Sequence, residues 1–443
     1  MKSVVSGIPQ IYARAKEGKI VTKLFYGAAA LVMVLTLQGC ATYSASFAQV
    51  ESATANRDLD GAVKSLDALK LAGADETLHH LNKGTLLRLQ GRYAESNKHF
   101  DAAKSLMEKF NAISIKEQAA SVAVNDTMKS YEGLPSEQMM VYSFEALNYL
   151  QMGEVDEAAI EARQFDVKQR LIAEKNSNAK YLSGAFVRYL NGMVYEAAGE
   201  RDSARIEMQK AVEGYKAQNS GFPVPKALTA DLNRLVAGNA APSEVVFILH
   251  NGLGPSLDEV SIRVPNPNPQ KGSALLSVSV PKFVRRSLPV GHVVLSAGSA
   301  SVASETVEDV NDIAEKSLKD RLPVITARAV ARMVVKNAAA GEVKKRNSEM
   351  AGSFGFLADI AVDVGTAVSE RADTRTWSLL PGNIYMARLA LPAGKHDVTA
   401  TYYSPSGNVL GTREYRDVVV MAGRKTYISD YFLNQPAKPK SPR

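Results

Sequence analysis

Small and aromatic residues recur at helical spacing through the first half of this 443-residue chain. In the stretch LNKGTLLRLQGRYAESNKHFDAAKSL, Gly84 stands where two helices would touch, Gly91 where the chain would turn, and Phe100 where an apolar ring would close the pair. The stretch NRDLDGAVKSLDAL repeats part of this pattern, and Ala62 precedes Ser96 by 34 residues. A helical hairpin cannot bury its apolar face alone, so this spacing predicts a stack of hairpins.

The intervals resemble those of the tetratricopeptide repeat. Two further units follow around Ala158 and Ala204, with Gly153 and Gly199 at their turns and insertions between the units. We therefore predict an α-helical array of this type over residues 40–237, with an irregular helical bundle as the alternative. Stacks of repeats offer a concave groove, so a protein partner is expected to bind there.

One loop inside the array has the sequence SYEGLPSEQMM. It carries Tyr131 close to Gly133 and Pro135, and Ser136 is a candidate helix N-cap. Tyr131 is either an interaction residue at the mouth of the groove or part of a packed turn between helices.

The second half of the chain changes from helical to strand-like patterning. Residues 238–242 form a linker, EVVFILH predicts a buried strand, and VSIRV and ALLSVSV predict two more. A helical insert is expected at about 307–370, with Pro323 beginning a second helix or kinking the first. Alternating apolar and polar residues near the end predict a β-sandwich-like module, so the fold class is α + β, with a mixed domain over 243–437 and a disordered tail at 438–443.

A basic stripe is predicted on the helical insert. Arg328, Arg332 and Lys336 step by four and would share one helix face. This face is either solvated or in contact with an anionic lipid or glycan. The apolar segment 351–370 contains two aspartates and is unsuited to span a membrane, so it would pack in the core or touch lipid or a partner.

The only cysteine, Cys40, follows an apolar run of about 14 residues, shorter than the roughly 20 that a transmembrane helix needs. That length suits an export signal, and the run ends in LQGC, which resembles the lipobox of bacterial lipoproteins. The resemblance implies a signal peptide at 1–39 and acylation of Cys40. Because Ala41 follows the cysteine, it also implies the periplasmic face of the outer membrane. A transmembrane helix or a plain signal peptide is the alternative.

Net charge adds little to this interpretation. The whole chain carries +7, but five basic residues and one acidic residue precede Cys40, so the mature chain carries only +3. Export excludes nucleic acid as a partner. The remaining anionic candidates are lipid head groups, envelope glycans and acidic proteins.

The stretch ADTRTWSLLP contains the only tryptophan. Arg375 can pair with Asp373 or bind backbone carbonyls, and Trp377 supplies a large anchor. This motif, with LPAGKH and ALNYLQMGEVDEAAIEAR, resembles a family of bacterial outer-membrane lipoproteins with a tetratricopeptide-like front half. The resemblance implies an architecture and a location, but no activity.

Motifs for catalysis are missing from the sequence. There is no GxSxG elbow, SxxK pair or P-loop, and the six histidines show no metal-ligand spacing, since His79 and His80 are adjacent and would point to different helix faces. We expect no enzyme, cofactor or metal. The predicted function is a lipid-anchored periplasmic scaffold that holds an envelope protein in its groove. A lipid or polysaccharide binding protein is the alternative, and an unrecognised hydrolase is the third hypothesis.

Overall fold

The structure is a computed structural model that describes residues 43–71, 73–117, 129–218, 221–266, 275–350 and 371–433. Side chains are described in these ranges except at 113–117 and 336–350. The predicted signal peptide, Cys40, the segment 351–370 and the C-terminal tail lie outside the described residues. None of the described helices is long and apolar enough to cross a membrane.

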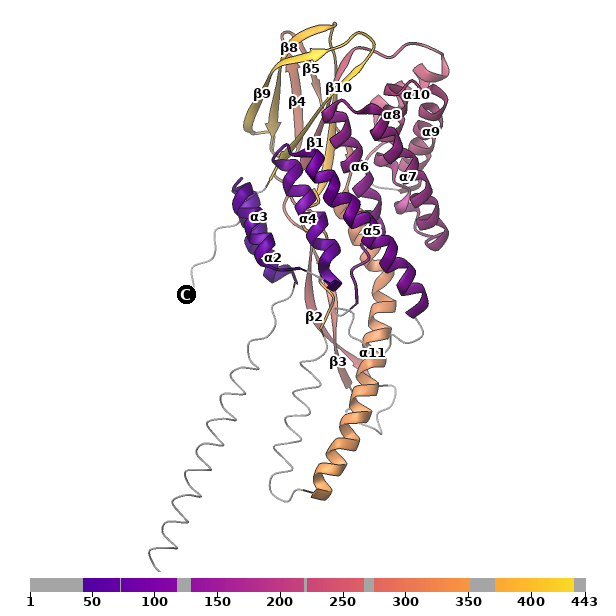
Figure 1. Cartoon of the computed structure of the whole chain (residues 1–443), viewed down its shortest axis with the longest axis vertical. Coiled ribbons are helices and arrows are strands. Elements are labelled where there is room, and N and C mark those ends of the chain that lie inside the picture. Colours follow the sequence, from indigo (N-terminus) through magenta and orange to yellow (C-terminus); the bar gives the residue numbers. More distant parts are fainter. Residues whose placement is uncertain are drawn as a thin grey trace, which may run out of the picture. The chain divides into compact units, whose positions relative to one another are not determined.

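The first half of the described chain forms four helical hairpins and a closing helix (Figure 1). Short 3-10 turns lie at Gly73–Asp75 and Lys180–Leu182. The helices are α2 Tyr43–Ala55, α3 Leu59–Ala68, α4 Glu76–Leu89, α5 Tyr93–Glu117, α6 Pro135–Met152, α7 Val155–Lys175, α8 Ala185–Ala197, α9 Arg201–Gln218 and α10 Lys226–Val236.

The glycines that predicted the repeats occupy the positions expected of them. Gly91, Gly153 and Gly199 turn the chain inside three hairpins with φ of 76°, 79° and 82°, a region that glycine enters without steric cost. A Cβ on Gly84 would lie 2.6 Å from the Phe100 ring, so the hairpin closes only because no side chain stands there. The predicted tetratricopeptide-like array is confirmed. The predicted N-cap at Ser136 is wrong. Helix α6 begins at Pro135, so Ser136 already lies inside the helix. Proline suits the first helical position because the N–H that it lacks would have no partner in the helix.

The second half contributes two four-stranded sheets and a two-stranded ribbon. The first sheet has the order β10-β1-β7-β6, the second β5-β4-β8-β9, and β2 pairs with β3. In the first sheet β1 runs parallel to β10 and antiparallel to β7. The elements are β1 Glu244–Asn251, β2 Ser256–Pro265, β3 Leu275–Val284, β4 His292–Ala297, β5 Ala300–Ala303, β6 Glu305–Glu308, α11 Val310–Met350, β7 Asn383–Ala390, β8 Gly394–Tyr403, β9 Val409–Val420 and β10 Lys425–Phe432.

Strand β1 lies at the centre of three layers and is buried along its whole length. Val245 and Phe247 pack with Val293 and Val398 of the second sheet, which makes a β-sandwich. Val246 lies on the opposite face of the first sheet and packs into the hydrophobic core of the helices. The predicted sandwich is therefore confirmed, but its strands come from both ends of the β-rich half.

The first sheet covers the face of the helical array where the sequence predicted a groove. Helices α6 and α8 bury nearly all of their residues, and α6 contacts β10. Gln151 of α6 donates to the Tyr427 carbonyl at 2.9 Å, and Phe144 lies edge-on to His250 of β1 at 5.2 Å. Residues on both sides of the linker at 238–242 therefore share one hydrophobic core. The groove is occupied by the chain's own strands.

Helix α11 continues through Pro323, where the sequence predicted a kink or a second helix. Asp309 caps it by accepting from the Asp312 N–H at 2.9 Å. Ala329 and Met333 pack against Leu276 and neighbouring residues of the β2–β3 ribbon. Figure 1 shows the ribbon and α11 side by side.

Candidate functional site

The residues predicted as anchors come together in one buried cluster. Arg375 binds both carboxylate oxygens of Asp373 at 2.8 and 2.7 Å, and it also reaches Asp75 and the Lys129 carbonyl, each at 2.8 Å. Its guanidinium lies 5.5 Å from the centre of the Tyr131 ring. The predicted pairing of Arg375 with Asp373 and with carbonyls is present, and Tyr131 belongs to a packed turn.

A carboxylate that the sequence did not single out organises this cluster. Glu137 is 1 % exposed and accepts hydrogen bonds from the Tyr131 hydroxyl, the Leu134 N–H at 2.8 Å, the Thr376 hydroxyl at 3.0 Å and the Trp377 N–H at 2.6 Å. Burial raises the pKa of Glu137, although these donors oppose the shift. The ADTRTWSLLP motif therefore holds the β-rich half onto the helices, and all of its residues except the partly exposed Asp373 are buried.

The predicted basic stripe is not one exposed surface. Arg328 is exposed, but Arg332 is only 3 % exposed beside the β2–β3 ribbon. The Lys336 side chain lies outside the described residues. Four-residue spacing places side chains along one helix face but cannot say which part of that face another element covers.

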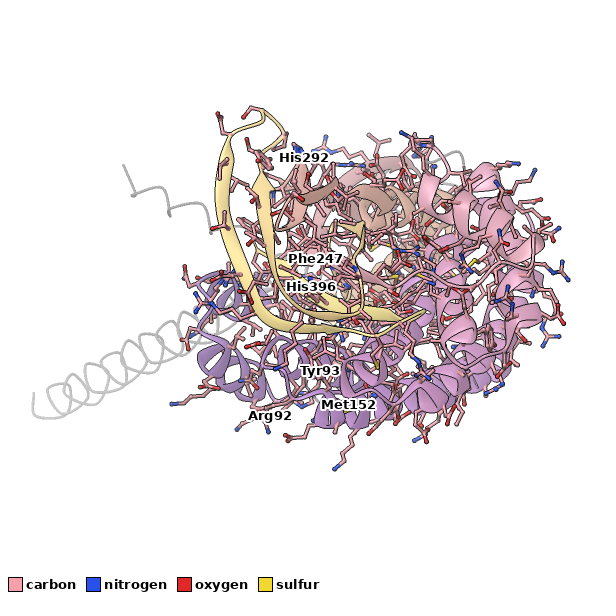
Figure 2. The ribbon with its side chains drawn as sticks, turned by 90° about the horizontal axis from the view of Figure 1, so that it is seen from above. Arg92, Tyr93, Met152, Phe247, His292 and His396 are labelled. Atoms are coloured by element: carbon pink, nitrogen blue, oxygen red, sulfur yellow. The ribbon has the colours of Figure 1, made fainter. Side chains whose placement is uncertain are left out.

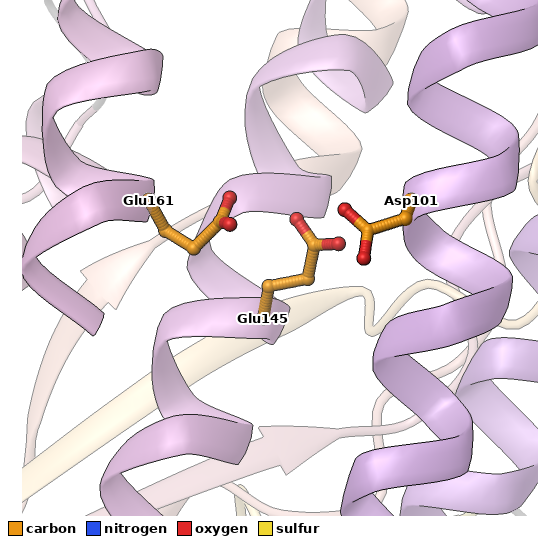
Figure 3. Close-up of side chains that lie close together, drawn as sticks. All are labelled: Asp101, Glu145 and Glu161. Atoms are coloured by element: carbon orange, nitrogen blue, oxygen red, sulfur yellow. The ribbon is translucent and has the colours of Figure 1, made fainter. Parts of the chain in front are cut away.

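Three carboxylates with metal-ligand spacing also lie inside the array. Among the described residues, Asp101, Glu145 and Glu161 bring one oxygen each within 4.8 Å of one another (Figure 3). The Lys104 ammonium already binds all three, at 3.1, 2.7 and 2.8 Å. We therefore assign this cluster to packing between α5, α6 and α7, because the lysine supplies the cation.

A cavity of about 370 Å³ opens where the helices meet the end of the β-rich half. Its walls are the α2–α3 and α4–α5 turns and the strands β9 and β10, and Tyr93 on its helical side is labelled in Figure 2. This volume lies in the range of ligand pockets. The lining residues are Arg57, Leu59, Arg88, Leu89, Gln90, Gly91, Tyr93, Arg413, Ser429, Asp430, Tyr431 and Leu433.

Arg88 is the most unusual residue of this cavity. It is 3 % exposed, yet it forms no salt bridge in the part of the chain that the structure describes. It donates only to neutral acceptors, namely the Asn148 side chain, Ser429 at 2.7 Å and the Phe144 carbonyl at 3.5 Å, and its Nε atom is buried with no hydrogen-bond partner there. Contacts with the Phe144 and Tyr93 rings, at 5.6 and 5.9 Å, compensate part of the charge.

The one acidic residue of the lining is already neutralised. Asp430 accepts from Arg413, Tyr402 and Tyr415, the last at 2.8 Å. Burial opposes the charge of Arg413, but the Asp430 carboxylate outweighs this and raises the pKa of the guanidinium. Arg57 forms no salt bridge among the described residues and is exposed at the rim. The cavity therefore presents positive charge without a matching anion.

Burial also keeps two other groups at this cavity, Tyr431 and His250, neutral. Burial raises the pKa of Tyr431, which lines the cavity. Burial and then the charge of Arg88 hold the pKa of His250, stacked on Tyr431 at 4.5 Å, well below its usual range. A neutral Tyr431 and a neutral His250 leave the arginines to set the charge of the site.

Sequence analysis missed this site because its residues lie far apart in the chain. Arg88 and Arg413 are 325 positions apart. Arg88 lies in the repeat stretch but is not one of its signature residues, and Arg413 lies in none of the motifs described above. The one available signal was Arg88 itself, an arginine at a core-facing position between Leu87 and Leu89. A charged residue there calls for a partner.

No protein-family model matches the sequence, and no curated protein matches it either. The crystal structure of RapI in its apo form is 13 % identical with a TM-score of 0.32, over 48 % of this chain and 54 % of RapI. The crystal structure of the S-layer protein rSbsC(31-844) matches 77 % of this chain and 45 % of rSbsC, with 8 % sequence identity and a TM-score of 0.12. The chain spans about half the length of these structures. Similarity at this level carries no argument about function.

Proposed function

We propose that this protein binds an anionic ligand of the bacterial cell envelope in the cavity lined by Arg57, Arg88 and Arg413. The observation that carries the proposal is the charge of Arg88, which is 3 % exposed and has no ion-pair partner among the described residues. A buried charge is costly unless an opposite charge accompanies it. A bound carboxylate or phosphate would supply that charge and accept a fork of hydrogen bonds.

The residues that line the cavity also indicate which apolar groups the ligand carries beside its negative charge. Tyr93 and Tyr431 offer aromatic surface beside the arginines, and Leu59 and Leu433 offer apolar surface. A sugar ring that carries a carboxylate, or a phosphorylated head group, combines an apolar face with a negative group. The proposed ligand is therefore an envelope glycan or a lipid head group.

The test compares binding of two probes to the purified full chain. Soluble peptidoglycan fragments carry carboxylates, and vesicles containing phosphatidylglycerol carry phosphates. Arg88→Lys keeps the charge but loses the planar fork. We expect it to weaken binding of the true ligand by about 10- to 100-fold, because a hydrogen bond to a charged group contributes about 1.5–3 kcal/mol.

Two further variants make the test decisive. Arg57→Asn removes a rim charge at a residue with φ of 61°, which asparagine tolerates, so the fold is expected to stay intact. Arg163→Ala removes an exposed arginine on α7, far from the cavity lining, and serves as the matched control. Equal affinity of wild type and both cavity variants for each probe, measured by calorimetry, would refute the proposal.

The proposal includes an anchor. The LQGC sequence supports acylation of Cys40 and a location on the periplasmic face of the outer membrane, where several acyl chains on one residue hold a protein firmly. The ADTRTWSLLP motif supports membership of the family of outer-membrane lipoproteins that it resembles. An envelope glycan or lipid is within reach of a protein anchored in this way.

A scaffold that holds a periplasmic or envelope protein is the second candidate. Because the chain's own strands occupy the groove, a partner would bind the outer helices. Ile160, Val167 and Leu171 of α7 share one helix face and are 42, 52 and 51 % exposed. Such a stripe is apolar surface that the described chain leaves uncovered.

In-cell crosslinking followed by mass spectrometry tests this second candidate. Introduction of a photo-crosslinking residue at Val167 is expected to capture one envelope protein from wild type and to lose it in Cys40→Ala, which removes the anchor. The same residue at the exposed Val419 of β9 is the control. Capture of many proteins at both positions would count against a scaffold.

A further inference from the structure

Three of the six histidines gather at one place on the helical array. His79 and His80 of α4 and His99 of α5 have ring centroids 5.6, 6.3 and 5.1 Å apart. The sequence indicated that adjacent histidines would diverge and would show no metal spacing. Consecutive residues do point about 100° apart on a helix. Helix α5 crosses α4 at this point, so His99 lies near both rings.

The closest approach in this cluster joins two potential ligand atoms. Nδ1 of His80 lies 2.9 Å from Nδ1 of His99. Nδ1 of His79 is buried and makes no hydrogen bond among the described residues. All three rings are half-buried, so the site is accessible from solvent.

We propose that His80 and His99, completed by His79, form a binding site for a divalent copper ion. Two imidazole nitrogens at about 2.0–2.1 Å from one ion are about 2.9 Å apart when the bond angle is a right angle. That is the cis arrangement of tetragonal Cu²⁺, whereas a tetrahedral Zn²⁺ needs a wider separation. The ion would replace the proton that the two Nδ1 atoms share. The three rings as placed do not bring one nitrogen each within 4.8 Å of one another, so His79 would have to turn its ring to reach the ion.

One acidic and one basic side chain lie close to this site, and they have opposite effects on the binding of a cation. Asp67 lies 3.8 Å from Nε2 of His79, but its carboxylate is also bound by the Lys83 ammonium at 2.8 Å. Burial lowers the pKa of all three histidines, and for His99 to about 4, so their lone pairs are free at neutral pH.

Copper titration of the full chain in detergent tests the proposal, in a Cys40→Ser background so that no thiol reduces the ion. We expect one Cu²⁺ per chain, an electron paramagnetic resonance signal with hyperfine coupling to at least two nitrogens, and weaker binding of Zn²⁺. His80→Gln and His99→Gln should each lower the affinity at least tenfold. His396→Gln, on β8, should leave it unchanged.

Each alternative outcome has a clear meaning. Affinity that is unchanged in His80→Gln and His99→Gln, or a signal without nitrogen coupling, would overturn the site and leave the short contact as a hydrogen bond between neutral imidazoles. Thermal unfolding of the metal-free variants identifies any loss that comes from misfolding. If a variant misfolds, the nitrogen coupling of the wild-type signal still shows whether histidine nitrogens bind the ion.

Discussion

Replacing Trp377 with alanine is expected to lower the free energy of unfolding by about 3–5 kcal/mol, the range for removing a large aromatic side chain from a core. Trp377 is 1 % exposed and lies 5.7 Å from the Phe100 ring and 5.3 Å from the Phe144 ring. Its indole N–H donates to the Thr85 hydroxyl at 3.0 Å. The change would leave a void where α4, α5 and α6 meet the β-rich half.

Chemical denaturation monitored by circular dichroism measures this effect. Trp377→Phe is the matched control, because it keeps a ring and loses the hydrogen bond to Thr85. We expect the phenylalanine variant to retain most of the stability. Equal losses in both variants would mean that the hydrogen bond, and not packing, holds the ADTRTWSLLP motif in place. No loss in either variant would contradict the assignment of Trp377 as an anchor.

Replacing Arg388 with alanine is expected to cost about 3 kcal/mol, the lower end of the range for breaking a buried ion pair, because two buried carboxylates lose their nearest cation. Asp231 keeps Arg234 at 3.0 Å, and Glu244 keeps Lys425 at 3.6 Å. Arg388 of β7 binds Asp231 of α10 at 2.7 Å, Glu244 of β1 at 2.9 Å and the Tyr189 hydroxyl of α8 at 2.6 Å. Asp231 and Glu244 are each 4 % exposed. The guanidinium therefore connects the helices to the central sheet.

The pH dependence separates charge from packing in this variant. Burial alone would raise the pKa of Asp231, but Arg388 outweighs it and holds this pKa below its usual value. That contribution to stability is present at neutral pH and is lost as the pH falls through the acid range. The ordinary pKa of an aspartate is 3.8, so this contribution is lost only below about pH 4. The stability lost in Arg388→Ala should therefore be larger at pH 7 than at about pH 3. A deficit independent of pH would indicate that lost packing, not charge, causes it.

Two other variants act as references for Arg388. Arg416→Ala removes an arginine whose partner, Glu414, is also on the surface, and we expect its unfolding midpoint to match wild type. Combining Arg388→Met with Asp231→Asn and Glu244→Gln removes both carboxylates that would lose Arg388. This triple variant should recover part of the stability lost in Arg388→Ala.

The sequence by itself determined the class of the fold and most of its elements. Glycines at 91, 153 and 199 predicted the turns of the hairpins, because only a residue without a side chain enters that backbone region freely. The run EVVFILH predicted a buried strand, and β1 is buried throughout. The pairing of Arg375 with Asp373, two residues away, was also predictable. These features depend on residues close together in the chain.

Only the tertiary structure decided which surfaces remain open. The spacing of the repeats predicted a groove, but the central sheet fills it. Four-residue steps predicted a basic stripe, but Arg332 is only 3 % exposed, on the part of α11 that packs against the β2–β3 ribbon. The cavity around Arg88 and the pair of His80 and His99 join residues on separate elements. Local patterns define what each element can bury, whereas the contacts between elements define what it does bury. These contacts join residues from 19 positions apart, as in His80 and His99, to 341 positions apart, as in Arg88 and Ser429.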